Sequence, residues 1–212
     1  MANHLFLFGG GPPFTGKFVR MFQNVMKNET CVVLVIDRPG IDQYKTNYVE
    51  ALNSVGVDCT FLTLPSKKNV CEQLAKCGGI VIGGGDTENY IAEIVHTPIG
   101  KVIQRQFKKG VPVAGFSAGA IIAMEKSYLS AKDNREQRPV VQEGLGLQAH
   151  TKIAVHFSEW QEEEHLRLLS KESNDDHYGI DEQSGMYVKN GKMESVDGKG
   201  VYLLKDDKFY KL

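Results

Sequence analysis

The segment VPVAGFSAGAIIA, around Ser117, has the residue pattern of a nucleophilic serine. An apolar strand-like run passes through Gly-x-Ser-x-Gly straight into an apolar helical run, which is typical of a nucleophile elbow. Small residues at Gly115 and Gly119 let strand and helix approach closely, so we expect Ser117 Oγ to project at the turn. Backbone N–H groups at the helix start could then stabilise an oxyanion. The motif predicts acyl transfer to water; the alternative is an inert serine in a turn rich in small residues.

A serine nucleophile needs a general base, and His156 is the histidine best placed for it. It ends the apolar run IAV, which puts it at the C-terminal edge of a strand, level with the elbow. Histidines at such positions can also be purely structural. The other five histidines are less favourably placed: His4 begins a strand and faces the opposite edge, His96 and His165 lie on predicted helices, and His150 and His177 lie in predicted loops.

A carboxylate or carbonyl must orient such a base. Asp181 and Glu182 follow the short apolar pair Gly179-Ile180, and Asp133 lies in the polar segment after the elbow. The residues alone leave these three candidates open. Because the sequence has no cluster of cysteines and histidines, we expect neither a metal nor a cofactor.

A second glycine-rich loop, IVIGGGDTEN, follows another apolar run. Its glycines leave backbone N–H groups uncovered at the carboxyl edge of the sheet, where ligands bind in open α/β folds. Asp86 or Thr87 is expected to cap the next helix. We therefore consider Gly84, Gly85 and Asp86 candidates for contact with the substrate.

The segment GPPFTGK near the N-terminus matches a Walker A loop up to its lysine. The next residue is Phe18, where a Ser or Thr should bind magnesium. Pro12 and Pro13 also lack two of the N–H groups that would hold phosphate. Nucleotide binding is therefore not expected from this loop.

Short apolar runs alternate with helical patterns and place these motifs in an α/β fold. The expected strands are His4–Phe8, Cys31–Ile36, Val57–Leu62, Gly79–Ile82, Val111–Phe116 and Lys152–Phe157. The expected helices are one capped by Thr15, then Gln43–Ser54, Asn69–Lys76, Thr87–His96, Gly100–Lys109 and Glu159–Ser170. Buried strands that alternate with helices indicate a three-layer α/β/α sandwich with a mostly parallel sheet.

The second half of the sequence departs from this alternation. Residues 130–143 are polar and read as a long surface loop. Two antiparallel hairpins are expected at the C-terminal end, with turns at Asn190-Gly191 and near Asp206-Asp207. No internal repeat or linker appears, so we expect one domain over residues 1–212.

Composition narrows the class of function. The formal net charge of −1 gives no reason to expect binding to nucleic acid or to a membrane surface. The first apolar run lacks a basic flank and reads as a strand rather than a signal peptide. Four cysteines without a CxxC pair are expected to be buried thiols. We therefore expect a cytoplasmic protein, either a monomer or a homodimer.

Several of these segments together resemble the dipeptidase E and cyanophycinase family of serine peptidases. GGGDTENYI, VPVAGFSAGA, GLGL, VHF with its following helix, and GIDEQSGMYVKNG occur in that family's order and spacing. They extend from about Gly79 to Tyr202, more than half of the chain. The resemblance implies a fold like that of the class I glutamine amidotransferases, with serine in place of cysteine at the elbow.

The resemblance also implies roles for individual residues. Ser117 would be the nucleophile, His156 the general base and Glu182 the carboxylate that orients it, with oxyanion donors at Gly85 and Ala118. A small peptide is the implied substrate. An alternative set of Ser117, His156 and Asp133 would follow the chain order of the α/β-hydrolases. The rival class is a non-catalytic protein that binds a small molecule or nucleotide with its glycine-rich loops.

Two departures from the family concern specificity. The resemblance leads us to expect Asn after the three glycines, but the sequence has Asp86. Glu162, Glu163 and Glu164 stand where arginines are common in the family, and at least one of them could face the cleft. A substrate carboxylate would be repelled there, so we do not expect strict specificity for aspartate. The alternative is that Asp86 only caps its helix and the three glutamates form a solvated face.

Overall fold

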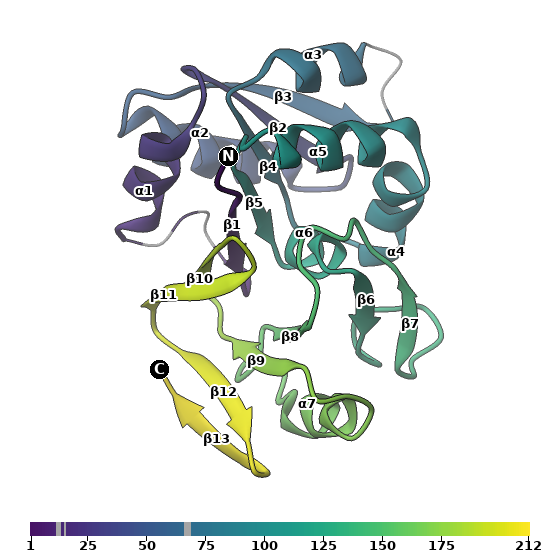
Figure 1. Cartoon of the computed structure of the whole chain (residues 1–212). Helices are drawn as coiled ribbons and strands as arrows, with labels where there is room; N and C mark the ends of the chain where they lie inside the picture. Colours follow the sequence, from purple (N-terminus) through teal and green to yellow (C-terminus); the bar gives the residue numbers. More distant parts are fainter. Residues whose placement is uncertain (12–13, 15, 66–68) are drawn as a thin grey trace.

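A central seven-stranded sheet forms the middle layer of the molecule (Figure 1). In this computed structural model, which describes residues 1–11, 14, 16–65 and 69–212, the strands lie in the order β11-β10-β1-β5-β4-β2-β3. The strands β1, β5, β4, β2 and β3 pair in parallel. The strand β10 pairs antiparallel with β1, and β11 pairs antiparallel with β10. Their bounds are His4–Phe8 for β1, Thr30–Ile36 for β2, Asp58–Leu64 for β3, Gly79–Ile82 for β4, Val113–Phe116 for β5, Ser184–Lys189 for β10 and Lys192–Gly198 for β11.

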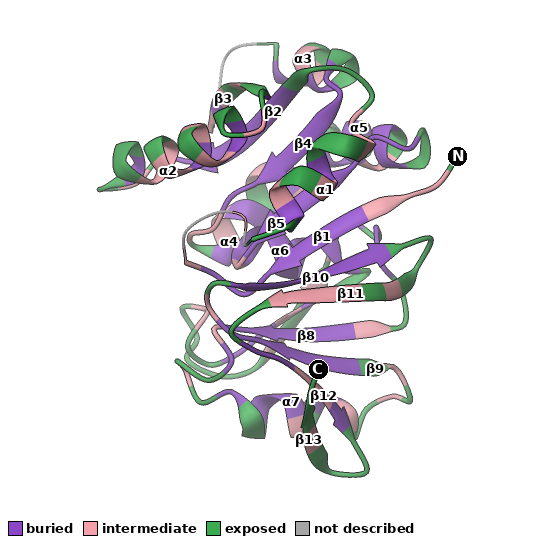
Figure 2. Cartoon of the chain, turned by 90° about the vertical axis from the view of Figure 1, so that its left-hand side faces the viewer, coloured by how far each residue is buried: buried purple, intermediate pink, exposed green. Residues whose placement is uncertain are grey.

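Helices cover both faces of this sheet, because every parallel strand is apolar on both sides. The helices α1 and α2 pack on one face, and α3, α4, α5 and α6 pack on the other. Their bounds are Phe18–Val25 for α1, Ile41–Asn53 for α2, Val70–Lys76 for α3, Thr87–Tyr90 for α4, Pro98–Lys108 for α5 and Ala118–Ala123 for α6. Figure 2 shows the central strands mostly buried, the edge strand β11 intermediate or exposed, and exposed residues on the outer sides of the helices. The predicted three-layer fold is confirmed.

A second sheet of four strands, in the order β13-β12-β9-β8, lies next to β10 and β11, on that side of the central sheet (Figure 1). Its strands are Thr151–Val155 for β8, Asp176–Ile180 for β9, Val201–Lys205 for β12 and Lys208–Lys211 for β13. The helix α7, Glu163–Ser170, packs on it through Leu166 and Leu169. The strand that carries His156 therefore belongs to this sheet rather than extending the central one.

The polar segment 130–143 was expected to be a loop throughout, but only part of it is one. Its last residues form β7, Val140–Glu143, which pairs with β6, Lys126–Leu129, in a two-stranded sheet. Residues 130–139 connect the two strands, and we call them the connecting loop. The predicted helix Thr87–His96 is shorter than expected: α4 passes into a π-helical turn, η1, at Ile91–Val95.

Other details also differ from the sequence-based expectation. His177 lies on β9 and not in a loop, and only Cys31 and Cys77 of the four free cysteines are fully buried. Both predicted C-terminal hairpins are present. Pro12, Pro13 and the predicted cap Thr15 lie outside the described residues. Within the described residues, no helix is long and apolar enough to cross a membrane.

Candidate active site

Ser117 occupies a strained turn between β5 and α6. Its backbone has φ 50° and ψ −110°, a conformation that an L-residue adopts only when its surroundings impose it. Close packing explains the constraint: a Cβ on Gly115 would lie 2.4 Å from the Gly119 carbonyl oxygen, and a Cβ on Gly119 would lie 2.3 Å from the carbonyl oxygen of Ile82. The predicted close approach of strand and helix is thus confirmed.

His156 and Glu182 lie next to Ser117 and complete a hydrogen-bonded chain. Ser117 Oγ is 2.9 Å from His156 Nε2, and His156 Nδ1 is 2.8 Å from Glu182 Oε1. His156 directly follows β8, and Glu182 lies in the connection from β9 to β10. The structure thus brings these three residues together from two different sheets. A carboxylate on Nδ1 favours the tautomer whose Nε2 can accept a proton from serine.

The glycines after β1 make room for the imidazole, a role that the sequence analysis missed. A Cβ on Gly10, whose φ is 145°, would lie 2.2 Å from His156 Cε1. The carbonyl of Gly9 accepts a hydrogen bond from the His156 N–H, at 3.1 Å. The available signal was the position of these glycines: they end a parallel strand at the same edge as the elbow. The start of the GPPFTGK segment, which was considered for nucleotide binding, therefore directly follows a glycine that lies against His156.

Trp160 is a second residue that the sequence analysis missed. Its indole stacks on the His156 imidazole, with ring centroids 4.2 Å apart and planes inclined by 17°. The backbone N–H of Trp160 donates a hydrogen bond to the backbone carbonyl of His156, at 2.7 Å. The signal for this contact is the short sequence separation, which lets a tight turn bring the rings together.

The loop after β4 lies against the serine. A Cβ on Gly84 would be 3.3 Å from Ser117 Cβ, so this glycine allows close approach. Gly85 follows with a φ of 157°. Ala118 is the first residue of α6, where an N–H has no carbonyl acceptor within its own helix. Gly84 and Ala118 therefore border Ser117, while the Cβ position of Gly85 faces Tyr90 and Arg38.

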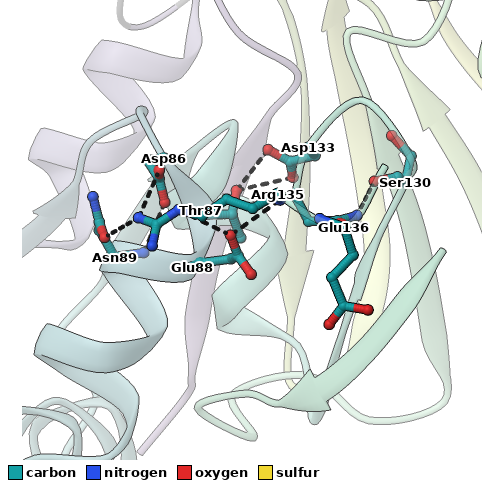
Figure 3. Close-up of polar contacts among 9 residues, drawn as sticks. Asp86, Thr87, Glu88, Asn89, Ser130, Asp133, Arg135 and Glu136 are labelled. Atoms are coloured by element: carbon teal, nitrogen blue, oxygen red, sulfur yellow. Dashed lines mark hydrogen bonds and ion pairs between the residues drawn. The ribbon is translucent and has the colours of Figure 1, made fainter. Parts of the chain in front are cut away.

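Asp86 is held by its neighbours (Figure 3). Its carboxylate accepts a hydrogen bond from the Asn89 N–H at 2.9 Å, so it caps α4 as the sequence predicts. Asp86 Oδ2 is also 3.4 Å from a guanidinium nitrogen of Arg135. Glu88 contacts the same guanidinium at 3.4 Å. The negative charge beside the candidate oxyanion loop is thus partly balanced by Arg135.

Asp133 contacts Thr87 rather than His156. Both carboxylate oxygens lie 2.9 Å from Thr87 Oγ1 (Figure 3). Burial raises the pKa of Asp133 to about 7, and the nearby charges of Glu162, Asp86 and Glu88 act in the same direction. The hydrogen bond from Thr87 opposes them.

The three glutamates after His156 do not share one environment. Glu162 is 5% exposed and accepts a hydrogen bond from the Ser130 hydroxyl at 2.9 Å. Burial raises its pKa. Glu163 and Glu164 are exposed at the start of α7. Of the three, Glu162 is thus turned inward, away from solvent, while the other two face it.

The remaining histidines have other surroundings. His4 Nδ1 lies 2.6 Å from the Tyr187 hydroxyl, and burial lowers the pKa of His4. His165 and His177 are also buried, which lowers the pKa of each. Among the residues that the structure describes, no three His, Cys, Asp or Glu side chains are grouped as a metal site would require.

A strained elbow serine paired with a histidine, at the carboxyl edge of a mostly parallel sheet, is the arrangement of a serine hydrolase. The model of peptidase family S51 matches residues 22–196. The chain therefore belongs to peptidase family S51, the peptidase E and cyanophycinase family, and is a serine peptidase of that family.

The chain is also similar to individual known proteins, in sequence to one and in fold to two others. Peptidase E of Haemophilus influenzae is 23% identical over 171 residues, which is 77% of each chain. The crystal structure of a peptidase from an acI-B1 Actinobacterium has a TM-score of 0.77 at 21% identity, covering 100% of this chain and 94% of that one. A putative peptidase E from Listeria monocytogenes has a TM-score of 0.70 at 18% identity, covering 94% of this chain and 100% of that one.

Proposed function

We propose that this peptidase hydrolyses a small peptide or peptide-like amide through an acyl-enzyme on Ser117. The observation that carries the proposal is the continuous chain from Ser117 Oγ to His156 Nε2 and from His156 Nδ1 to Glu182. Ser117 is the nucleophile, His156 the general base and Glu182 the carboxylate that orients it. We include residues 1–212 in one peptidase domain, because the two sheets contribute to the same site.

In the first half of the reaction, Ser117 Oγ attacks the amide carbonyl and its proton passes to His156 Nε2. The N–H groups of Gly85 and Ala118 stabilise the oxyanion that forms. His156 then gives its proton to the leaving amine as the C–N bond breaks, and the acyl group remains on Ser117. In the second half, water attacks the ester with His156 as base, and Ser117 recovers its proton.

The acyl-side residue of the substrate is proposed to be neutral or basic rather than strictly aspartate. Asp86 directly follows the proposed oxyanion glycine, and Gly84 borders the nucleophile. A substrate carboxylate about 4 Å from Asp86 in water would be repelled by about 1 kcal/mol, which lowers the affinity by a factor of about five. A cationic substrate group would be attracted by a similar amount. Arg135 reduces the effect of Asp86, so the preference should be modest.

Labelling separates a hydrolase from a binding protein. A serine-reactive fluorophosphonate should form one adduct, located on Ser117 by peptide mass spectrometry. Ser117→Ala should remove the adduct, and a Ser127→Ala control, whose hydroxyl is buried outside the site, should keep it. Failure of the unaltered protein to form the adduct would contradict the proposed mechanism.

A dipeptide panel tests the specificity. Asp-Leu, Ala-Leu and Lys-Leu differ only before the cleaved bond. We expect kcat/KM to be lowest for Asp-Leu, and Asp86→Asn to reduce the difference. Arg135→Ala should increase it, because Asp86 and Glu88 then lose their cation. Preferential cleavage of Asp-Leu by the unaltered protein would overturn this part of the proposal.

A further inference from the structure

The connecting loop, residues 130–139, contacts both halves of the candidate site. One group of its side chains holds the start of α4, which follows the Gly83–Gly85 loop. Another group holds the Trp160–Glu162 segment, which follows His156. Because the two halves belong to separate parts of the fold, a shared contact element can set their relative position.

On the α4 side, the contacts are specific and close to the glycine loop (Figure 3). Thr87 is fully buried, and its hydroxyl lies 2.9 Å from each Asp133 oxygen. The side chain of Arg135 contacts Asn89 Oδ1 at 2.9 Å, in addition to the carboxylates of Asp86 and Glu88. Arg135 also donates its backbone N–H to Glu88, at 3.2 Å. The loop thus holds α4 through a partly buried hydrogen bond and an exposed ionic cluster.

On the histidine side, two residues of the same loop make the contacts. The Ser130 hydroxyl donates to Glu162 at 2.9 Å, and this bond is buried. The Lys132 ammonium donates to the Trp160 carbonyl. Trp160 in turn stacks on His156. The loop therefore reaches the general base through the residue that lies against its ring.

A cavity of about 10 Å³ lies between the connecting loop and the histidine side. Its walls include Ser130 and Asp133 of the connecting loop and Trp160, Glu162 and His165 of the histidine side, so the loop and that side share one interior boundary. The volume suits nothing larger than about one water molecule. Glu162 is buried and Asp133 is half-buried, so their contacts are less screened than those of fully exposed groups.

We propose that Asp133 is a positioning residue for the oxyanion hole. It fixes Thr87, and through the adjoining backbone it fixes the Gly83–Gly85 loop, while Ser130 and Lys132 hold the segment behind His156. This inference rests on the proposed function, because it assigns the oxyanion donors to Gly85 and Ala118. In this role Asp133 differs from a triad member. Its function is to accept a hydrogen bond from Thr87, and it does not need to place a charge beside the imidazole of His156.

Paired substitutions at the two ends of the hydrogen bond test this role. Thr87→Val removes the hydroxyl at nearly constant volume, and Asp133→Ala removes its acceptor. Each should lower kcat by about 10- to 100-fold with KM changed less than about 2-fold, because a small displacement of the donors affects the transition state most. The double variant should be no slower than the slower single variant, since one interaction is removed in all three.

Conservative variants and a control complete the experiment. Thr87→Ser keeps the hydroxyl and Asp133→Asn keeps an acceptor, so both should recover most of the turnover lost in Thr87→Val and Asp133→Ala. Affinity for a peptide aldehyde, whose hemiacetal oxygen occupies an oxyanion hole, should fall in parallel with kcat. Arg138→Ala is the control, because its ion pair with Glu136 stays within the connecting loop.

The outcomes separate this inference from the proposed mechanism. A labelled Ser117 and an inactive Ser117→Ala, together with unaltered kcat in Thr87→Val, would overturn the positioning role alone. An Asp133→Asn variant as slow as Asp133→Ala would also overturn it. If the unaltered protein fails to label at Ser117, both proposals are wrong. Thr87→Val carries the test by itself if Asp133→Ala does not fold.

Discussion

The indole of Trp160 lies almost flat on the imidazole of His156, with their ring centroids 4.2 Å apart. The histidine itself has a backbone φ of 48°, in the left-handed region, immediately after β8. A strained backbone alone does not fix the ring about its side-chain torsions. The stack therefore restrains the ring that must face Ser117 and Glu182 together.

Removing this stack should slow the reaction. We expect Trp160→Ala to lower kcat by about 10- to 100-fold, because the imidazole gains orientations that do not reach Ser117. Trp160→Phe keeps an aromatic face and should retain much more of the activity. Steady-state kinetics on one dipeptide would compare them, and equal activity of the Ala and Phe variants would exclude a role for the stack.

Ser117→Ala and His156→Ala should each abolish measurable turnover without unfolding the protein. Because the two groups act as one unit, the double variant should be hardly slower than either single variant. Circular dichroism would check the fold, and a sensitive endpoint assay would measure residual hydrolysis. Turnover near that of the unaltered protein in Ser117→Ala would assign the nucleophile elsewhere.

Glu182→Gln should lower kcat far more than Asp133→Asn does. The expected loss for Glu182→Gln is roughly 10²–10⁴-fold by analogy with triad aspartates, since a neutral amide stabilises the imidazolium less and can favour the wrong tautomer. Asp133→Asn keeps the acceptor for Thr87. Kinetics on both variants under one set of conditions gives the ranking, and the reverse ranking would assign the orienting role to Asp133.

Gly10→Ala should impair catalysis for a steric reason. Its new Cβ would lie 2.2 Å from His156 Cε1, so the ring must move away from Ser117. Gly56→Ala is a matched control, because Gly56 also has a positive φ, 74°, but has nothing within 4 Å of a Cβ. The measurement is kcat alongside the thermal midpoint. Equal activity in the two variants would show that the ring tolerates the added methyl group.

The pH dependence of stability should report the buried carboxyl group of Asp133. Its pKa is about 7 in the folded protein against 3.8 for the ordinary group, with burial as the main cause. The protonated Asp133 carboxyl therefore contributes to the stability of the folded protein fully below about pH 4, and this contribution is lost as the pH rises to about 7. Each pKa unit corresponds to about 1.4 kcal/mol.

The substitution Asp133→Asn isolates this contribution, because asparagine does not ionise. The stability of the variant relative to the unaltered protein should increase from pH 4 to pH 8, by on the order of 1–4 kcal/mol. Urea unfolding at several pH values measures the difference. A difference that stays constant over this range would mean that Asp133 ionises as readily in the folded protein as in the unfolded one.

The sequence predicts the parallel sheet and the positions of Ser117 and His156, because each depends on a local pattern: an apolar strand that ends at a special residue. Glu182 was singled out only by the family resemblance, because the residues alone left Asp181, Glu182 and Asp133 as candidates for the carboxylate that orients His156. The contacts of Asp133 with Thr87 and of Trp160 with His156 depend on packing between elements or on a tight turn. No periodic pattern encodes such contacts.

The missed strands have a similar explanation. β6 and β7 are four residues each and half exposed, so their alternation is short and is obscured by the polar loop between them. β9 contains Asp176 and His177 before its apolar end, which made only Gly179-Ile180 visible as an apolar pair. The second sheet could not be separated from the first by apolar content, because β8 is as buried as a central strand.

The contribution of two sheets to one hydrogen-bonded chain has a consequence during synthesis on the ribosome. A nascent chain that ends before Glu182 already contains Ser117 and His156, yet it lacks the carboxylate on Nδ1 and the strand β10 that pairs beside β1. Under the proposed mechanism, full hydrolytic competence therefore arises late in translation, when the connection from β9 to β10 joins the sheets. An incomplete or truncated product would then carry Ser117 and His156 without the carboxylate that is proposed to orient the histidine.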